Sequence, residues 1–131
     1  MCHSDRVLSR SDLEELQSLE EGMWRSETRG DREWMDAHRA SDFFEFGLSG
    51  RRYDRGEKLD AQVGDIDAVL PLRDFRCTNL GDSHVQATYQ IECYRGRANR
   101  SSIWHRMGTG WVMDFHQGTP TEGGRTRVGP A

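Results

Sequence analysis

The stretch that most constrains the fold of this 131-residue chain lies close to its C-terminus and alternates apolar and polar side chains. Trp111, Met113 and Phe115 recur at every second position, which is the period of a β-strand with one buried face. The same period puts Asp114 and His116 on the opposite face. We therefore predict a half-buried strand that ends in a group of polar side chains.

Strand signals dominate the second half of the chain. Most of the expected strands are separated by glycine-containing turns such as Gly81-Asp82 and Gly108-Thr109-Gly110. The strands are expected at about residues 66–70, 73–80, 85–94, 99–107 and 111–117. Successive strands joined by tight turns form an antiparallel meander.

Helix signals precede these strands. Ser11 to Glu14 has the form of a capping box and predicts the start of a helix with an apolar stripe, which Gly30 ends. Asp31 predicts the cap of a second, shorter helix through about Ala40.

A small hairpin and a third helix are expected between these helices and the meander. Phe43 to Phe46 is aromatic and too short for a helix, and a glycine turn leads from it into Arg51 to Tyr53. Asp54 followed by Glu57 predicts another helix cap, and Gly64 the end of that helix. Helices first and antiparallel strands last indicate an α+β domain, with the helices covering one face of the sheet and a pocket between them.

The charge balance argues against a nucleic acid as partner. The chain has 18 Lys and Arg against 22 Asp and Glu, giving a net charge of −4, and the two signs are interspersed. The length predicts one domain at residues 11–121, between a flexible segment at 1–10 and a flexible tail at 122–131.

The apolar residues do not predict a membrane partner. Their longest runs are far short of the roughly 20 residues that span a bilayer, and no apolar signal core follows the N-terminus. Cys2, Cys77 and Cys93 are widely spaced and odd in number, which indicates free thiols. We therefore expect a cytoplasmic protein.

Three segments, in this order of elements, resemble the nuclear transport factor 2-like superfamily: Asp42 to Gly47, Arg100 to Trp104, and Trp111 to Pro120. The resemblance covers about residues 11 to 121 and is to the polyketide-cyclase-like branch, in particular to uncharacterised bacterial stand-alone domains. It implies a cystatin-like cone, in which two to three N-terminal and central helices pack in a strongly curved, mixed but mainly antiparallel sheet with a cavity. Members of that superfamily are commonly homodimers, and include isomerases, dehydratases, polyketide cyclases, and binding or assembly domains.

Glu45 is the first catalytic candidate, because burial among three phenylalanines would raise its pKa toward the range of a general base. The resemblance to the superfamily's ketosteroid isomerases implies a carboxylate base in this region, at Glu45 or Asp42. Those enzymes also use a tyrosine from the first helix, which this chain lacks, leaving Trp24 as a donor there. Arginines that could instead pair with Glu45 in a structural role are Arg51, Arg52 and Arg100.

His116 is the second catalytic candidate, since an unperturbed imidazole titrates at about pH 6.5. The alternative is a structural histidine. Gln117 faces the other way along the strand, and the sequence leaves open which of the two lines the cavity.

The last hairpin has two possible registers. A two-residue turn puts Trp104 opposite Met113, whereas a three-residue turn puts Trp104 opposite Asp114 and Ser102 opposite His116. We favour the second register because it gathers polar and aromatic side chains into one patch.

Three functions fit the sequence. They are small-molecule binding in a polar-aromatic cavity, acid/base catalysis by Glu45 and/or His116, and assembly of a homodimer through the outer face of the sheet. The side chains expected to bind an unknown small molecule are Trp24, Tyr53, Tyr89, Arg100, Ser102, Trp104 and Gln117. The outer face would present Arg73, Arg76, Gln86, Thr88 and Gln90.

No metal ligand and no cofactor is predicted. The histidines, His3, His38, His84, His105 and His116, form no H-x-H or H-E-x-x-H pair, so a metal site would have to be assembled across strands. A phosphate-binding glycine loop and a nucleophile elbow are also absent from the sequence.

Overall fold

The computed structural model describes residues 8–61, 67–93 and 96–121, with residues 59–61 described by their backbone alone. Its elements are α1 (Arg10–Gly22), α2 (Ser26–Arg29), α3 (Arg32–Ala37), β1 (Arg39–Phe46), β2 (Arg52–Asp54), α4 (Arg55–Ala61), β3 (Arg73–Asn79), β4 (His84–Cys93), β5 (Gly96–Met107) and β6 (Gly110–Pro120). Parts of the predictions for the segment 1–10, the helix end at Gly64 and the tail 122–131 lie outside the described residues. Residues 67–70, expected to belong to a short strand, form none.

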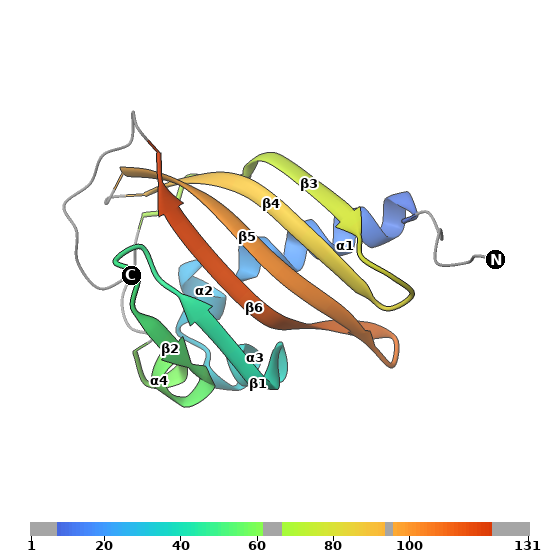
Figure 1. Ribbon diagram of the computed structural model, residues 1–131, viewed down its shortest axis with the longest axis horizontal. Coiled ribbons are helices and arrows are strands. Elements are labelled where there is room, and N and C mark those ends of the chain that lie inside the picture. The colour runs from blue at the N-terminus through green and yellow to red at the C-terminus, as the bar shows by residue number, and fades with distance from the viewer. Residues whose placement is uncertain (1–7, 62–66, 94–95, 122–131) are drawn as a thin grey trace.

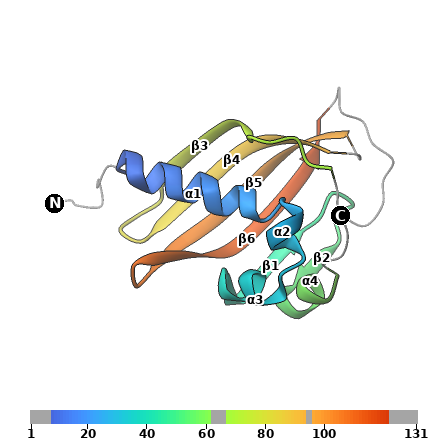
Figure 2. The same cartoon turned by 180° about the vertical axis from the view of Figure 1, so that it is seen from behind.

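The six strands form one sheet in the order β2-β1-β6-β5-β4-β3. β1 runs parallel to β6, and the other neighbours are antiparallel, which confirms the predicted mixed, mainly antiparallel sheet. The described helices lie on one face, with α1 behind β3 to β5 and with α3 and α4 near β1 and β2 (Figures 1 and 2). The opposite, outer face carries none of these helices (Figure 1). The α+β fold class is confirmed.

The first helix begins at Arg10, before the expected start at Ser11. Ser9 is its cap: the Ser9 hydroxyl accepts a hydrogen bond from the Asp12 amide at 3.0 Å, and the Asp12 carboxylate accepts one from the Ser9 amide at 3.2 Å. The capping box therefore exists, two residues earlier than predicted, because a serine also stands at position 9.

The first helix ends at Gly22, and the predicted continuation to Gly30 was wrong. The ring of Trp34 from α3 crosses the helix end so closely that a Cβ on Gly22 would lie 2.5 Å from its Cη2 atom. Gly30 ends the separate helix α2 instead. A tertiary contact with α3, which the local sequence does not specify, thus marks the end of α1.

The two other predicted caps are confirmed. Asp31 caps α3, although this helix ends at Ala37 and not near Ala40, because the chain enters β1 at once. At α4, the Asp54 carboxylate accepts from the Glu57 amide and the Glu57 carboxylate from the Asp54 amide, both at 2.9 Å. The predicted hairpin of β1 and β2 precedes this cap.

The core lies between the helices and the covered face of the sheet. Its fully buried large apolar side chains come from both layers and are Leu16, Met35, Phe43, Val85, Ile91, Trp104 and Met113. No helix within the described residues is both long enough and apolar enough to cross a membrane.

A β-bulge at Asp114 interrupts β6. Trp104 of β5 pairs with Met113, whereas its neighbour Ile103 pairs with Phe115, so that Asp114 is the extra residue. Near the Gly108-Thr109 turn the strands therefore keep the register that we did not favour.

Beyond the bulge the strands have the favoured register, with Ser102 opposite His116. The inserted residue also exchanges the two faces for the residues that follow it in β6: positions that the alternation would place on one face of the sheet lie on the other. His116 is buried on the covered side, and Gln117 is exposed on the outer side. Phe115 faces outward as well, so the prediction that it shares one buried face with Trp111 and Met113 was wrong.

Candidate functional site

A fully buried carboxylate, Glu20, lies between α1 and the covered face of the sheet. Its Oε1 atom accepts a hydrogen bond from Trp104 Nε1 at 2.8 Å. Its Oε2 atom accepts from the hydroxyls of Tyr89 at 2.7 Å and Ser102 at 2.9 Å. Three donors from two strands thus satisfy a side chain from the helix, as burial of a carboxyl group requires.

The hydrogen bonds continue from Ser102 to His116 and Arg100. His116 Nδ1 lies 2.7 Å from Ser102 Oγ, and Arg100 Nη1 lies 3.5 Å from His116 Nε2. A guanidinium can only donate, so Nε2 accepts and the proton of a neutral His116 resides on Nδ1. His116 then donates to Ser102, which donates to Glu20.

Arg100 is the terminal donor of this chain and is only 6% exposed. Its guanidinium carbon lies 4.9 Å from the centre of the Trp24 ring. Gly118, its neighbour on β6, leaves room for it, since a Cβ at Gly118 would be 2.4 Å from Nη1. Among the residues that the structure describes, no carboxylate forms an ion pair with Arg100, and its buried Nε has no hydrogen-bond partner.

Aromatic side chains enclose these polar groups. Trp24 Nε1 donates to the Tyr89 hydroxyl at 3.1 Å, which leaves the Tyr89 proton for Glu20. The ring centres of Trp24 and His116 are 6.1 Å apart. Trp24 therefore acts as a donor to the site, as proposed from the sequence, but it lies beyond the end of α1 and acts through Tyr89.

Glu45 lies beside His116 in the parallel pair of β1 and β6 and forms a buried ion pair with Lys58, with Nζ and Oε2 3.2 Å apart. Burial alone would raise the pKa of Glu45, but the charge of Lys58, aided by His116 and Arg100, holds it below its ordinary value. The predicted rise of this pKa was therefore wrong. The partner is also a lysine and not one of the arginines considered.

Glu20 and His116 have pKa values displaced in opposite directions. Burial raises the pKa of Glu20 to about 7, against the three hydrogen bonds from Trp104, Tyr89 and Ser102. Burial lowers the pKa of His116 to about 3, with Glu45 acting in the opposite direction. The expectation that His116 titrates near neutrality was wrong. At pH 7 His116 is a neutral hydrogen-bonding group, whereas Glu20 holds a proton far more readily than an ordinary glutamate.

The structure gathers six of the predicted site residues around Glu20 and places Tyr53, Gln117 and Asp42 elsewhere. Tyr53 is buried, but its ring lies against Lys58, 5.0 Å from Nζ. Gln117 is exposed on the outer face, because of the bulge, and cannot line the interior. Asp42 is exposed as well. The side chains that come together around Glu20 are Trp24, Tyr89, Arg100, Ser102, Trp104 and His116.

Glu20 itself was not among the predicted site residues. The signal that could have found it is its position on the buried face of α1, one turn after Leu16 and one turn before Trp24. A carboxylate on the apolar stripe of a helix must find donors elsewhere in the fold.

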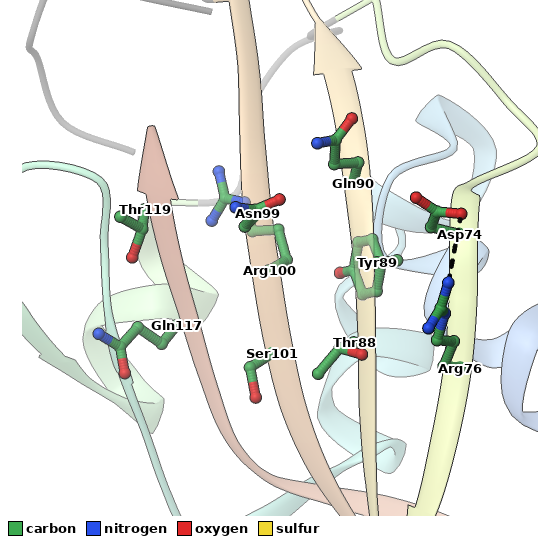
Figure 3. Close-up of a pocket in the computed structure, with 10 residues that line it drawn as sticks. All are labelled: Asp74, Arg76, Thr88, Tyr89, Gln90, Asn99, Arg100, Ser101, Gln117 and Thr119. Atoms are coloured by element: carbon green, nitrogen blue, oxygen red, sulfur yellow. Dashed lines mark ion pairs between the residues drawn. The ribbon is translucent and has the colours of Figure 1, made fainter. Parts of the chain in front are cut away.

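The outer face of the sheet is polar over β3, β4 and β5 and carries a shallow hollow of about 390 Å³ (Figure 3). Thr88, Ser101 and Gln117 lie side by side across three strands there. Arg76 and Asp74 form an exposed ion pair at its edge, with 3.9 Å between Nη2 and Oδ1. The surface predicted to meet a partner is thus open and polar.

No protein-family model matches the chain, and no curated protein matches it. Solved structures do. A candidate Ca/calmodulin-dependent kinase II association domain from Exiguobacterium sibiricum is 24% identical, with a TM-score of 0.72 over 89% of this chain and 98% of its own. An NTF2-like protein from Cytophaga hutchinsonii is 14% identical, with a TM-score of 0.70 over 85% of this chain and 98% of its own. A cystatin-like fold protein from Burkholderia xenovorans is 14% identical, with a TM-score of 0.66 over 87% and 95%.

The chain has the nuclear transport factor 2-like fold. In this NTF2-like chain the helices and the bent sheet hold the Glu20 network between them. The fold resemblance expected from the sequence is confirmed. Because a shared fold hosts many activities, function has to be argued from the interior residues themselves.

Proposed function

We propose that this domain binds a small molecule carrying an anionic group, in the interior around Arg100. The supporting observation is that Arg100 is buried without an ion-pair partner among the described residues. Buried charges in proteins are normally paired, because removing an ion from water is costly. A ligand carboxylate would supply the missing partner.

The neighbouring acidic groups do not neutralise Arg100 well. Glu45 is engaged by Lys58 at 3.2 Å, and the raised pKa of Glu20 leaves that carboxyl partly protonated at neutral pH. A guanidinium presents parallel N–H groups that match the two oxygens of a carboxylate. Trp24 and Tyr89 would face the apolar part of the ligand. The ligand class proposed is therefore a small organic carboxylate.

The experiment is a thermal-shift and calorimetric screen of small carboxylates, each paired with its neutral amide. Carboxylates should bind and raise the melting temperature, whereas the amides should not. Arg100→Gln should weaken binding by roughly 30-fold or more, about 2 kcal/mol, since it removes a buried charged contact. Arg100→Lys keeps the positive charge but loses the two parallel N–H groups. Its affinity should lie between those of Arg100→Gln and the unmodified protein.

Arg97→Gln is the matched control, because Arg97 lies on the same strand but is exposed. It should bind like the unmodified protein. Equal binding of the amides, or full binding by Arg100→Gln, would contradict the proposal.

A second candidate function is acid/base catalysis on the bound molecule. The observation that favours it is the pKa of Glu20, about 7, beside the chain that joins Ser102 to His116. A group that is half protonated at the working pH can both give and take a proton. In this second proposal Glu20 exchanges a proton with the bound molecule, and His116 orients the Ser102 hydroxyl through its hydrogen bond. Glu45, which is paired with Lys58, is the less available of the predicted catalytic groups.

We also propose that the domain forms a homodimer through the outer face of its sheet. Phe44, Phe46 and Phe115 cluster there, with ring centres 5.0 to 6.0 Å apart. An apolar cluster on a sheet face that no described helix covers is favourable for contact with a second copy.

A further inference from the structure

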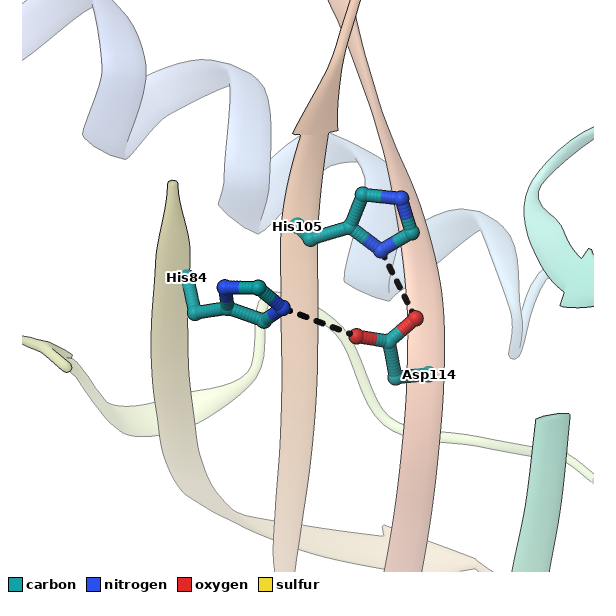
Figure 4. A group of neighbouring side chains, drawn as sticks. All are labelled: His84, His105 and Asp114. Carbon is teal, nitrogen blue, oxygen red and sulfur yellow. Dashed lines mark hydrogen bonds and ion pairs between the residues drawn. The ribbon is translucent and has the colours of Figure 1, made fainter. Parts of the chain in front are cut away.

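Two imidazoles and a carboxylate meet on the outer face of the sheet, away from the Glu20 network (Figure 4). His84 Nε2 lies 3.5 Å from one oxygen of Asp114, and His105 Nδ1 lies 2.7 Å from the other. The possible ligand atoms of the three side chains all lie within 4.8 Å of one another. The side chains come from three adjacent strands, β4, β5 and β6.

The backbone accounts for this meeting. His84 pairs directly with His105 in the antiparallel register, so their side chains share a face. Asp114 is the bulged residue of β6, and its carboxylate is turned toward His105. A bulge re-aims side chains in this way. The three groups come from three different strands, and even His105 and Asp114 are nine residues apart, which explains why no short histidine motif revealed them.

The spacing suits a metal ion. Ligands at 2.0–2.2 Å from a tetrahedral zinc ion are about 3.3–3.6 Å from one another. The separation of His84 Nε2 from Asp114 already has that value, and His105 Nδ1 would have to move away from the Asp114 oxygen by about 1 Å or less. The candidate ligand atoms all lie within 4.8 Å of one another, so the widest separation would have to close by at most about 1.5 Å.

We propose that His84, His105 and Asp114 bind one divalent transition-metal ion. Two imidazoles among three ligands favour zinc and its neighbours in the first transition row over magnesium or calcium, which prefer oxygen ligands. Three protein ligands leave at least one coordination position open.

The three side chains line a broad hollow of about 690 Å³ in the outer face. Its other lining residues are Asp42 and the apolar Phe44, Ile103 and Phe115. The metal site lies on the outer face of the sheet, whereas the anion proposed above lies on the covered side, so neither proposal depends on the other.

The test uses the full chain freed of metal with a chelator. Calorimetry with Zn²⁺ should give saturable binding of one ion per chain, and Co²⁺ should give the absorption of a nitrogen- and oxygen-ligated site. His84→Ala, His105→Ala and Asp114→Asn should each weaken binding by about tenfold or more, since even losing a partner of a ligand costs that much. Melting curves recorded without metal verify that each variant folds.

Asp74→Asn and His38→Ala are the controls, because both residues lie outside the cluster. Neither should change the affinity. The proposal is overturned if no saturable binding occurs, if Asp114→Asn and His105→Ala bind like the unmodified chain, or if Co²⁺ shows sulfur-to-metal charge transfer from a cysteine.

Discussion

Glu20 and His116 influence stability in opposite ways as the pH changes. Folding raises the pKa of Glu20 from 4.5 to about 7. The contribution of Glu20 to the free energy of unfolding is therefore complete below pH 4.5 and is lost as the pH rises to 7. Folding lowers the pKa of His116 from 6.5 to about 3, so its contribution is full above pH 6.5 and is lost as the pH falls to 3. Between pH 4.5 and 6.5 the two effects cancel.

Glu20→Gln should remove this cancellation. The free energy of unfolding should then fall by about 1.4 kcal/mol for each pH unit between 6.5 and 4.5, about 3 kcal/mol in total, whereas the unmodified protein should stay nearly constant. Urea unfolding at several pH values measures this. Glu14→Gln, at an exposed position of the same helix, should keep the flat profile. Identical profiles for the two variants would refute the raised pKa of Glu20.

The sequence suggested several residues of the site but not its centre. Arg100, Ser102, Trp104 and His116 were grouped correctly, since their spacing on two strands follows from strand geometry. Glu20 was missed because its donors are at least 69 residues away along the chain. The pKa values of Glu45 and His116 were wrong for a related reason: Lys58 and the depth of burial come from the tertiary fold.

At the scale of elements, the junction between α1 and α3 depends on the absence of a side chain at Gly22. Trp34 packs against Gly22, and its ring lies tilted at 34° to that of His38, with ring centres 4.3 Å apart. The end of α1 and the start of the region that leads into β1 are thereby held together. Local helix signals could not reveal this contact.

Gly22→Ala should therefore destabilise the protein, although alanine is the better helix former. Its Cβ would lie 2.5 Å from the Trp34 ring, and displacing the ring should cost about 1–3 kcal/mol. Gly110→Ala is the control, since no atom lies within 4 Å of the added carbon. It should change stability by no more than about 0.5 kcal/mol. Urea denaturation compares the two, and equal stabilities would show that Trp34 moves freely.

At the scale of the whole molecule, the described helices lie on one face of the sheet, and the homodimer is proposed to form through the opposite face (Figures 1 and 2). Light scattering at high micromolar concentration should give the mass of two chains. Phe44→Glu should give one chain, because a charge would be buried in the apolar cluster of the proposed interface. Thr109→Glu, in an exposed turn, should remain a dimer. A monomeric unmodified protein would refute the proposed interface.

The architecture was predicted well because the patterns that define it are local. Alternating side chains and glycine turns indicated the meander, and the cap at Asp54 indicated α4. The parallel pairing of β1 with β6 joins segments about 70 residues apart and has no local signal. It follows only from the resemblance to a known fold.

The extra residue at Asp114 also affects how this chain can be compared with others of its fold. One inserted residue exchanges inside and outside for the rest of the strand, so a relative without it would turn the counterpart of His116 to solvent. When this chain is aligned with another of the same fold, identical residues after Asp114 occupy equivalent positions only if both chains have the bulge. A single-residue change in length here would be an evolutionary route by which surface chemistry becomes interior chemistry without any substitution.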